Sequence, residues 1–212
     1  MHWLFGRRNE KVAEESKAAP ESRRRDFVGI MLSSQKLVTT QMDIMNLQLL
    51  NTVGERREEL AALLIDCVKS GASVGFMPPL SVAEALSYWD GVATDLQSGS
   101  RLLLLAEIDK RIAGAIQLAL CTKKNGLHRA EVEKLMVHTE QRSAGLGRAL
   151  MNETEQLARR HHRKLLVLDT RYGDIASDLY RKCGYTEAGQ IPAYALSASG
   201  QLHATTFFYK QL

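Results

Sequence analysis

The sequence lacks features that define several classes of protein. Its 212 residues contain three cysteines, Cys67, Cys121 and Cys183, and no Cys-x-x-Cys pair. This scarcity excludes a disulfide scaffold and most zinc modules, and it is typical of a protein in a reducing cytoplasm. The six histidines show no metal-ligand spacing, so we expect no metal site.

Long apolar runs are scarce as well. Stretches such as Leu102–Ala106 fall far below the roughly 20 residues that a membrane-spanning helix needs. Residues 1–5 are too brief to serve as a secretory leader. We therefore expect a cytoplasmic protein that neither crosses nor binds a membrane.

Basic charge is also not concentrated on the main part of the chain. Residues 1–41 carry eight Lys or Arg and five Asp or Glu, whereas residues 42–212 carry twenty and nineteen. A nucleic-acid-binding domain would normally gather basic charge on its fold, so we expect no nucleic-acid partner. Residues 10–26 have almost no large apolar side chains. The sequence therefore predicts a flexible basic extension over 1–41 and one domain over 42–212.

Apolar spacing and turn signals predict regular elements from residue 43 onward. Ser81 and Glu84 form a capping-box pattern that opens a helix, and Gly184 is typical of a residue just past a helix end. A first strand is expected from the apolar pattern of Ile44, residues 46–50 and Val53. Further strands are expected at 101–108, 111–121, 128–137, 164–169, 185–190 and 203–210, and helices at 55–70, 82–97, 146–161 and 174–183. This order predicts an α/β fold with a central mixed, mostly antiparallel sheet and helices on both faces.

A glycine-containing loop between a strand and a helix points to anion binding. In Arg142-x-x-Gly145-x-Gly147, glycines let backbone N–H groups approach a phosphate closely, and the following helix N-terminus favours negative charge. A P-loop would need Gly-Lys-Ser/Thr, which is absent. A dinucleotide fingerprint would need Gly or Ala where Leu150 stands, although Asp169 lies at an acceptable distance for its acidic residue, so that alternative stays open.

At this point the sequence resembles a known superfamily. The Arg142, Gly145 and Gly147 pattern is similar to the acetyl-CoA motif of the GNAT N-acetyltransferases. A second segment matches that superfamily at the expected spacing, through Ala176, Leu179, Tyr180, Lys182, Gly184 and Tyr185. The resemblance covers about residues 43–212. Residues 71–76 and 200–209 are also similar to the tabtoxin-resistance branch.

The resemblance implies acetyl-CoA as cosubstrate and assigns roles to particular residues. Backbone groups of Leu135, Met136 and Val137 would bind the pantetheine arm, and the N–H of Met136 or Val137 would stabilise the developing oxyanion. Tyr180 would donate a proton to the departing thiolate, with a packed aromatic residue as the alternative. The phosphate-binding loop would comprise Arg142, Ser143, Ala144, Gly145, Leu146, Gly147 and Arg148.

The general base is less well defined. Glu131 occupies the position where several relatives place a catalytic Glu, Glu133 shares its strand face, and Asp169 ends the next strand. All three could instead be solvated or paired charges, and some relatives use no dedicated base. Gly173 stands where the family often has an Asn that binds the cofactor arm, which puts contacts from that corner in doubt.

The expected function is transfer of an acetyl group from acetyl-CoA to a primary amine of a small molecule, antibiotic-like or amino-acid-like. The alternatives are a protein-amine acetyltransferase and a non-catalytic acyl-CoA-binding sensor, and a homodimer is left open. Residues 71–79 and 191–200 are expected to wall the acceptor side. The aromatic residues that could line it, with core packing as the alternative, are Phe76, Tyr88, Trp89 and Tyr194.

Overall fold

A computed structural model describes residues 45–212, so the predicted extension over 1–41 lies outside the described residues. The helices are α1 (Arg57–Lys69), α2 (Val82–Gln97), α3 (Leu146–Arg160) and α4 (Ala176–Lys182). The strands are β1 (Asn46–Leu50), β2 (Arg101–Ile108), β3 (Arg111–Leu120), β4 (Arg129–Val137), β5 (Leu165–Arg171), β6 (Thr186–Leu196) and β7 (Leu202–Gln211). The predicted order of elements therefore agrees with the observed one.

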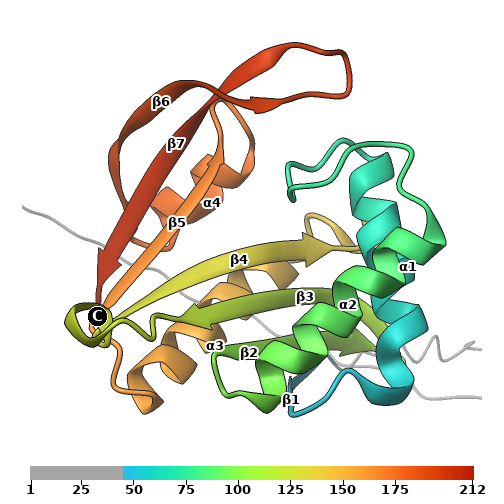
Figure 1. Cartoon of the computed structure of the whole chain (residues 1–212), viewed down its shortest axis with the longest axis horizontal. Helices are drawn as coiled ribbons and strands as arrows, with labels where there is room; N and C mark the ends of the chain where they lie inside the picture. Colours follow the sequence, from blue (N-terminus) through green and yellow to red (C-terminus); the bar gives the residue numbers. More distant parts are fainter. Residues whose placement is uncertain (1–44) are drawn as a thin grey trace, which may run out of the picture. The chain divides into compact units, whose positions relative to one another are not determined.

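The strands form one seven-stranded sheet in the order β1-β2-β3-β4-β5-β7-β6. Every neighbouring pair is antiparallel except β4 and β5, which run parallel. One buried apolar cluster joins the sheet to α1 and α2, and a second joins it to α3 and α4. This confirms the predicted α/β class, with a mixed, mostly antiparallel sheet and helices on both faces (Figure 1).

Local sequence signals account for several boundaries. Ser81 caps α2 by accepting a hydrogen bond from the Glu84 backbone N–H, and the Glu84 carboxylate accepts one from the Ser81 N–H. Asp109 and Lys110 both have positive φ in the tight β2–β3 turn. β6 is longer than predicted because pairing with β7 continues past Pro192 through an irregularity between Ile191 and Ala195.

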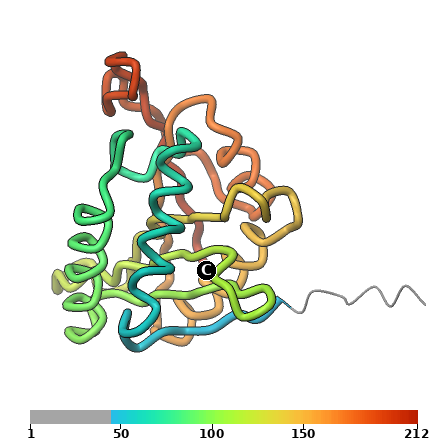
Figure 2. Tube along the Cα trace, turned by 90° about the vertical axis from the view of Figure 1, so that its right-hand side faces the viewer, coloured from blue at the N-terminus to red at the C-terminus, as the bar shows by residue number. Residues whose placement is uncertain are grey.

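The parallel pair at the centre of the sheet is short. β4 and β5 pair only over Arg129–Glu131 and Leu165–Val167. Beyond that point β4 stays paired with β3 and β5 stays paired with β7, so the two central strands diverge (Figure 1). Both views place the tip of the β6–β7 hairpin and the α1–α2 connection at the same end of the molecule (Figure 2). The divergence therefore opens between segments that lie far apart in the sequence.

Candidate active site

A cavity of about 1160 Å³ lies where β4 and β5 diverge. Its walls come from β4, the loop before α3, the end of β5, α4 and the segment that follows α1. Tyr194, Ala195 and Thr205 add a contribution from β6 and β7. Its volume slightly exceeds the usual range for small-molecule sites, which leaves room for a large ligand together with a second, smaller one.

The loop before α3 has the backbone geometry of an anion site. Ser143 and Gly145 have φ values of 65° and 86°, which turn the chain sharply into the helix. Ala149 is the first residue of α3 whose N–H donates to a carbonyl within the helix, that of Gly145 at 3.1 Å. The preceding N–H groups have no intrahelical partner, and the helix dipole adds positive potential beside them.

The Arg142 side chain braces this loop. Its Nη2 donates to Ser70 Oγ at 2.7 Å, and its Nε donates to the Val137 carbonyl at 3.3 Å. These bonds tie the loop to the end of α1 and to the end of β4. The guanidinium thus fixes the position of the loop as well as lining the cavity.

Most of the predicted cofactor residues surround the same space. Leu135, Met136 and Val137 line the cavity from β4, and the loop contributes Arg142, Ser143, Gly145, Leu146, Gly147 and Arg148. The cavity wall does not include Ala144. Leu146 is 3% exposed, so its side chain belongs to the core and its contribution to the wall is mainly backbone. All the residues predicted to bind the cofactor, except Ala144, therefore line one cavity in the structure.

Backbone alternation along β4 distinguishes Met136 from Val137. The N–H of His138 donates to the Ala113 carbonyl on β3 at 2.9 Å. Because N–H groups along a strand alternate in direction, Met136 also directs its N–H toward β3, and Val137 directs its N–H away from β3, toward the divergence. The Val137 carbonyl, which accepts from Arg142, points in the same direction.

β4 contains a bulge that the sequence did not predict. Gln117 faces Glu133 and Ala115 faces Met136, so Ile116 alone stands opposite both Lys134 and Leu135. Lys134 has a φ of 51°, an uncommon conformation for a residue other than glycine. No glycine or proline stands at this position, so the sequence pattern did not predict a bulge.

The three candidate bases all line the cavity but have different partners. Glu133 forms an ion pair with Arg101, and Asp169 accepts a hydrogen bond from Thr205 Oγ1 at 2.8 Å. Within residues 45–212, the carboxylate of Glu131 has no hydrogen bond or ion pair. Partial removal from water raises the pKa of Glu131, and the carboxylates of Glu133 and Asp169 raise it further.

Tyr180 lies on α4 with its side chain 7% exposed and lines the cavity. Its ring packs against Phe208 and Tyr185, with centroid distances of 5.8 and 6.2 Å. Burial raises the pKa of the Tyr180 phenol, and the carboxylates of Asp174 and Asp169 add to this effect. The raised pKa keeps the phenol protonated at neutral pH, so its hydroxyl can donate a hydrogen bond to a bound ligand.

The corner where the family often has Asn is built differently here. Gly173 has a φ of 79°, and the Asp174 carboxylate accepts hydrogen bonds from the Ala176 N–H at 3.1 Å and from Arg171 at 3.4 Å. Gly173 has no side-chain amide to offer the cavity, and the neighbouring Asp174 carboxylate is engaged at the start of α4.

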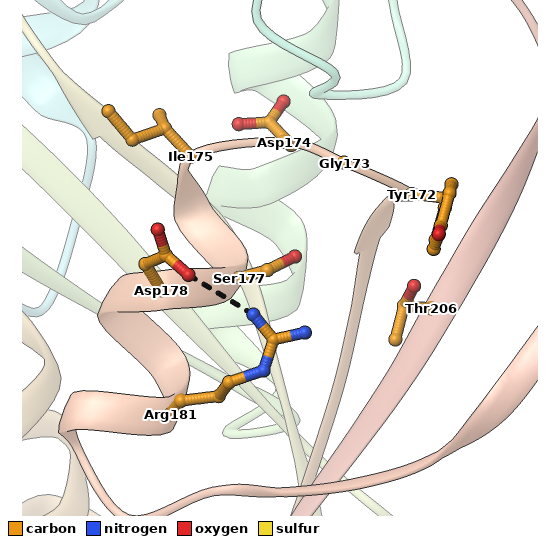
Figure 3. A pocket seen from close by; sticks show the side chains of 8 residues that line it. All are labelled: Tyr172, Gly173, Asp174, Ile175, Ser177, Asp178, Arg181 and Thr206. Carbon is orange, nitrogen blue, oxygen red and sulfur yellow. Dashed lines mark hydrogen bonds and ion pairs between the residues drawn. The ribbon is translucent and has the colours of Figure 1, made fainter.

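A second, smaller cavity of about 240 Å³ lies beside α4 and shares Gly173, Asp174 and Ile175 with the large one. In Figure 3, Arg181 and Asp178 point toward each other, and they form an ion pair at 3.1 Å. The charged side chains of this hollow are all paired, Asp174 with Arg171 and Asp178 with Arg181.

Only some of the residues expected to wall the acceptor side line the large cavity. Residues 70–75, Tyr194 and Ala195 do line the large cavity, whereas Trp89 is fully buried in the core. Tyr88 packs edge-on against Trp89 and Phe76, so its ring belongs mainly to the packing of α2. Cys67, Arg171 and Thr205 line the cavity without having been predicted, because only the folded chain brings them to it.

Across residues 45–212, no group of three or more His, Cys, Asp or Glu side chains is arranged to hold a metal ion. No helix in this part of the chain is both long and apolar enough to span a membrane.

Residues 74–185 match a family model described as the acetyltransferase (GNAT) family. Among solved structures, the fold is similar to that of ribosomal-protein-alanine N-acetyltransferase from Brucella melitensis, at 19% identity and a TM-score of 0.65, covering 80% of this chain and 99% of that one. An acetyltransferase of the GNAT family from Streptococcus pneumoniae aligns at 19% identity and a TM-score of 0.66, covering 79% and 100%. The protein yncA from Salmonella typhimurium, solved with its cofactor acetyl-CoA, aligns at 20% identity and a TM-score of 0.64, covering 80% and 94%.

Proposed function

The chain belongs to the acetyltransferase (GNAT) family, and from this premise we propose that it transfers the acetyl group of acetyl-CoA to a primary amine of a small molecule by direct attack. The family match covers more than half of the chain, so the resemblance seen in its two motifs is confirmed at the level of the superfamily. The likeness to the tabtoxin-resistance branch stays a prediction.

The observation that carries the proposal is the divergence of β4 from β5 directly beside the loop before α3. Unpaired backbone groups of β4 offer hydrogen bonds to an extended amide-containing arm, and the first N–H groups of α3 offer them to a diphosphate. Gly147 lets the start of α3 pack closely against α4, because a Cβ atom there would lie 3.2 Å from Leu179 Cδ2. Acetyl-CoA supplies the thioester in this arrangement.

The side chains around the cavity suit the proton transfers of the reaction. Glu131 accepts the proton that an acceptor ammonium must lose before its nitrogen can attack, directly or through water. The N–H of Val137 donates to the oxygen on which negative charge develops. Tyr180 gives its proton to the departing sulfur. Glu133 and Asp169 are weaker candidates for the base because Arg101 and Thr205 already engage them.

Experiment can distinguish an enzyme that acetylates small amines from two alternative functions. A protein-amine acetyltransferase would modify a protein or peptide amine and leave small amines unchanged. An acyl-CoA sensor would bind acetyl-CoA without turnover. We also expect the protein to act in the cytoplasm, in keeping with its few cysteines.

The test combines calorimetry with acetyl-CoA and a thiol-release assay over small amines and peptides. We expect saturable acetyl-CoA binding, and release of the CoA thiol that depends on a small amine. Binding without release in any mixture would favour the sensor. No binding would contradict the proposal as a whole.

A further inference from the structure

Lys134 is the residue at this site whose placement the proposed reaction does not explain. It lines the cavity on β4, one residue after Glu133 and three after Glu131. In a regular strand Lys134 would share a sheet face with Val132, which is buried against the cluster that contains α3. A lysine there would bury its ammonium in apolar surroundings.

The bulge prevents this outcome. Leu135 packs toward the α3 cluster and Met136 toward the α1 and α2 cluster, so Lys134 is the extra residue of the bulge. Its side chain crosses to the α2 side, where Nζ lies 6.0 Å from the centroid of the Tyr88 ring. Bulges often re-aim one side chain next to an active site, and here that side chain is a cation.

The surroundings of Lys134 leave room at its ammonium group. A Cβ atom on Gly75 would lie 3.3 Å from Lys134 Nζ, so a glycine on the α1–α2 connection gives this group its space. Within residues 45–212, no carboxylate lies within ion-pair distance of Lys134 Nζ, and no hydrogen bond from it is found. A cation that lines a cavity without an anionic partner is suited to a ligand that brings one.

Other cations around the cavity are already engaged or lie elsewhere. Arg142 donates to Ser70 and to the Val137 carbonyl, and Arg171 pairs with Asp174. Arg148 lies in the first turn of α3, on the side assigned to the diphosphate. Lys134 instead lies beside Tyr88 of α2 and beside Gly75, which belongs to the α1–α2 connection expected on the acceptor side.

We propose that Lys134 selects the acceptor by binding a carboxylate, so that the preferred substrates are amines of amino-acid type. This inference rests on the proposed function, since it concerns the second substrate of the same site. Glu131 and Lys134 then present opposite charges on one strand, and a zwitterion can place its ammonium at the first and its carboxylate at the second. Polyamines, which carry only positive charge, would meet Lys134 as a repulsive contact.

The test compares each of the twenty protein amino acids with its carboxamide, and with putrescine and spermidine, in a thiol-release assay. In the wild-type protein we expect kcat/KM to be about 10- to 100-fold higher for the preferred amino acid than for its carboxamide, the range for one charge-assisted hydrogen bond. In Lys134→Met this ratio should fall to near one through a higher KM for the amino acid. Turnover of the carboxamide should fall much less than that of the amino acid, because the carboxamide brings no anion to this position.

Two further variants control the experiment. Lys110→Met removes another lysine with positive φ, outside the cavity wall, and should keep the wild-type ratio. Lys134→Arg retains a cation and should keep most of the preference. Equal loss for acid and carboxamide in Lys134→Met, or a wild-type preference for neutral amines or polyamines, would overturn the inference while leaving the proposed function intact. Failure to bind acetyl-CoA would instead overturn the proposed function.

Discussion

Single side chains in the cavity differ in how far the rest of the protein already engages them. Glu133 is held by Arg101, and Asp169 by Thr205, whereas Glu131 and Tyr180 face the cavity with no hydrogen bond to any residue of 45–212. A group that must exchange protons with a substrate has to be available to it. The two residues with the clearest proposed roles are therefore the two without a competing partner.

Tyr180→Phe removes the proposed proton donor and keeps the ring that packs against Phe208. We expect turnover to fall about 100-fold, a typical contribution of general acid catalysis, while acetyl-CoA affinity stays nearly unchanged. Turnover is measured by thiol release and affinity by calorimetry. Tyr185→Phe is the control, because its hydroxyl is buried without a partner. Wild-type turnover in Tyr180→Phe would remove this residue from the mechanism.

Glu131→Gln tests the general base by pH dependence. The raised pKa of Glu131 predicts that the acidic limb of kcat/KM lies above the usual carboxyl range, because only the ionised form accepts a proton. In the variant we expect activity to drop about 100-fold and this limb to disappear. Glu133→Gln should retain the limb and move it to lower pH, because the Glu133 carboxylate raises the pKa of Glu131. A limb that persists in Glu131→Gln would assign it to another group.

Glu131→Gln, which should lower activity, should increase the stability of the folded protein at neutral pH. A carboxyl whose pKa is raised by folding favours the protonated form in the native state, so its contribution to stability is lost as pH rises through the native pKa. Glu131→Gln should therefore raise the thermal midpoint at pH 7, with a difference from wild type that shrinks below the usual carboxyl pKa. Thermal scans across this pH range measure it, and an unchanged difference at all pH values would contradict the assigned shift.

At the scale of elements, the loop and α3 were largely predictable because their signals are local. Glycines at 145 and 147 and the helical spacing that follows specify the turn and its exposed N–H groups without help from the rest of the chain. The bulge at Lys134 and the extension of β6 past Pro192 were not predictable in this way. Both depend on register with a neighbouring strand, which no short stretch of sequence encodes.

Gly147→Val tests the loop as a unit. A Cβ atom at this position already approaches Leu179 Cδ2 to 3.2 Å, and the two further methyl groups of Val would push the start of α3 away from α4. We expect acetyl-CoA affinity to fall at least about 10-fold, which calorimetry measures. Gly91→Val is the control, because that glycine also lies in a helix but has nothing within 4 Å of its Cβ position. Retained affinity in Gly147→Val would discredit the loop assignment.

At the scale of the whole molecule, the cavity requires a sheet whose two halves are weakly paired at its centre. Only three residue pairs join β4 to β5, so contacts through the helices must hold the halves together. One such contact is polar: Lys210 on β7 donates to both oxygens of Glu155 on α3, at 2.8 and 2.7 Å, and to the Cys183 carbonyl at 2.6 Å. Sequence spacing could not reveal this pair, whose members lie 55 residues apart.

Lys210→Met leaves the Glu155 carboxylate, on a residue only 8% exposed, without its cation. We expect the free energy of unfolding to fall by about 3 kcal/mol, as for other buried pairs that lose one partner. Urea unfolding measures this change. Arg160→Met, which breaks an exposed pair with Glu153 on the same helix, should cost less than about 1 kcal/mol. Equal effects of the two variants would show that the buried pair does not join the halves.

The predicted division of the chain at residue 41 leads to a final test. Residues 10–26 have too few large apolar side chains to build a core, whereas the buried residues of the two clusters described within 45–212 run from Val53 to Phe208. A protein comprising residues 42–212 should therefore keep the thermal midpoint, acetyl-CoA affinity and kcat/KM of the full chain, because every residue assigned to the cavity lies within it. A lower midpoint would show that the first 41 residues pack on the domain. An unchanged midpoint with a higher KM for the amine would show instead that these residues take part in acceptor binding.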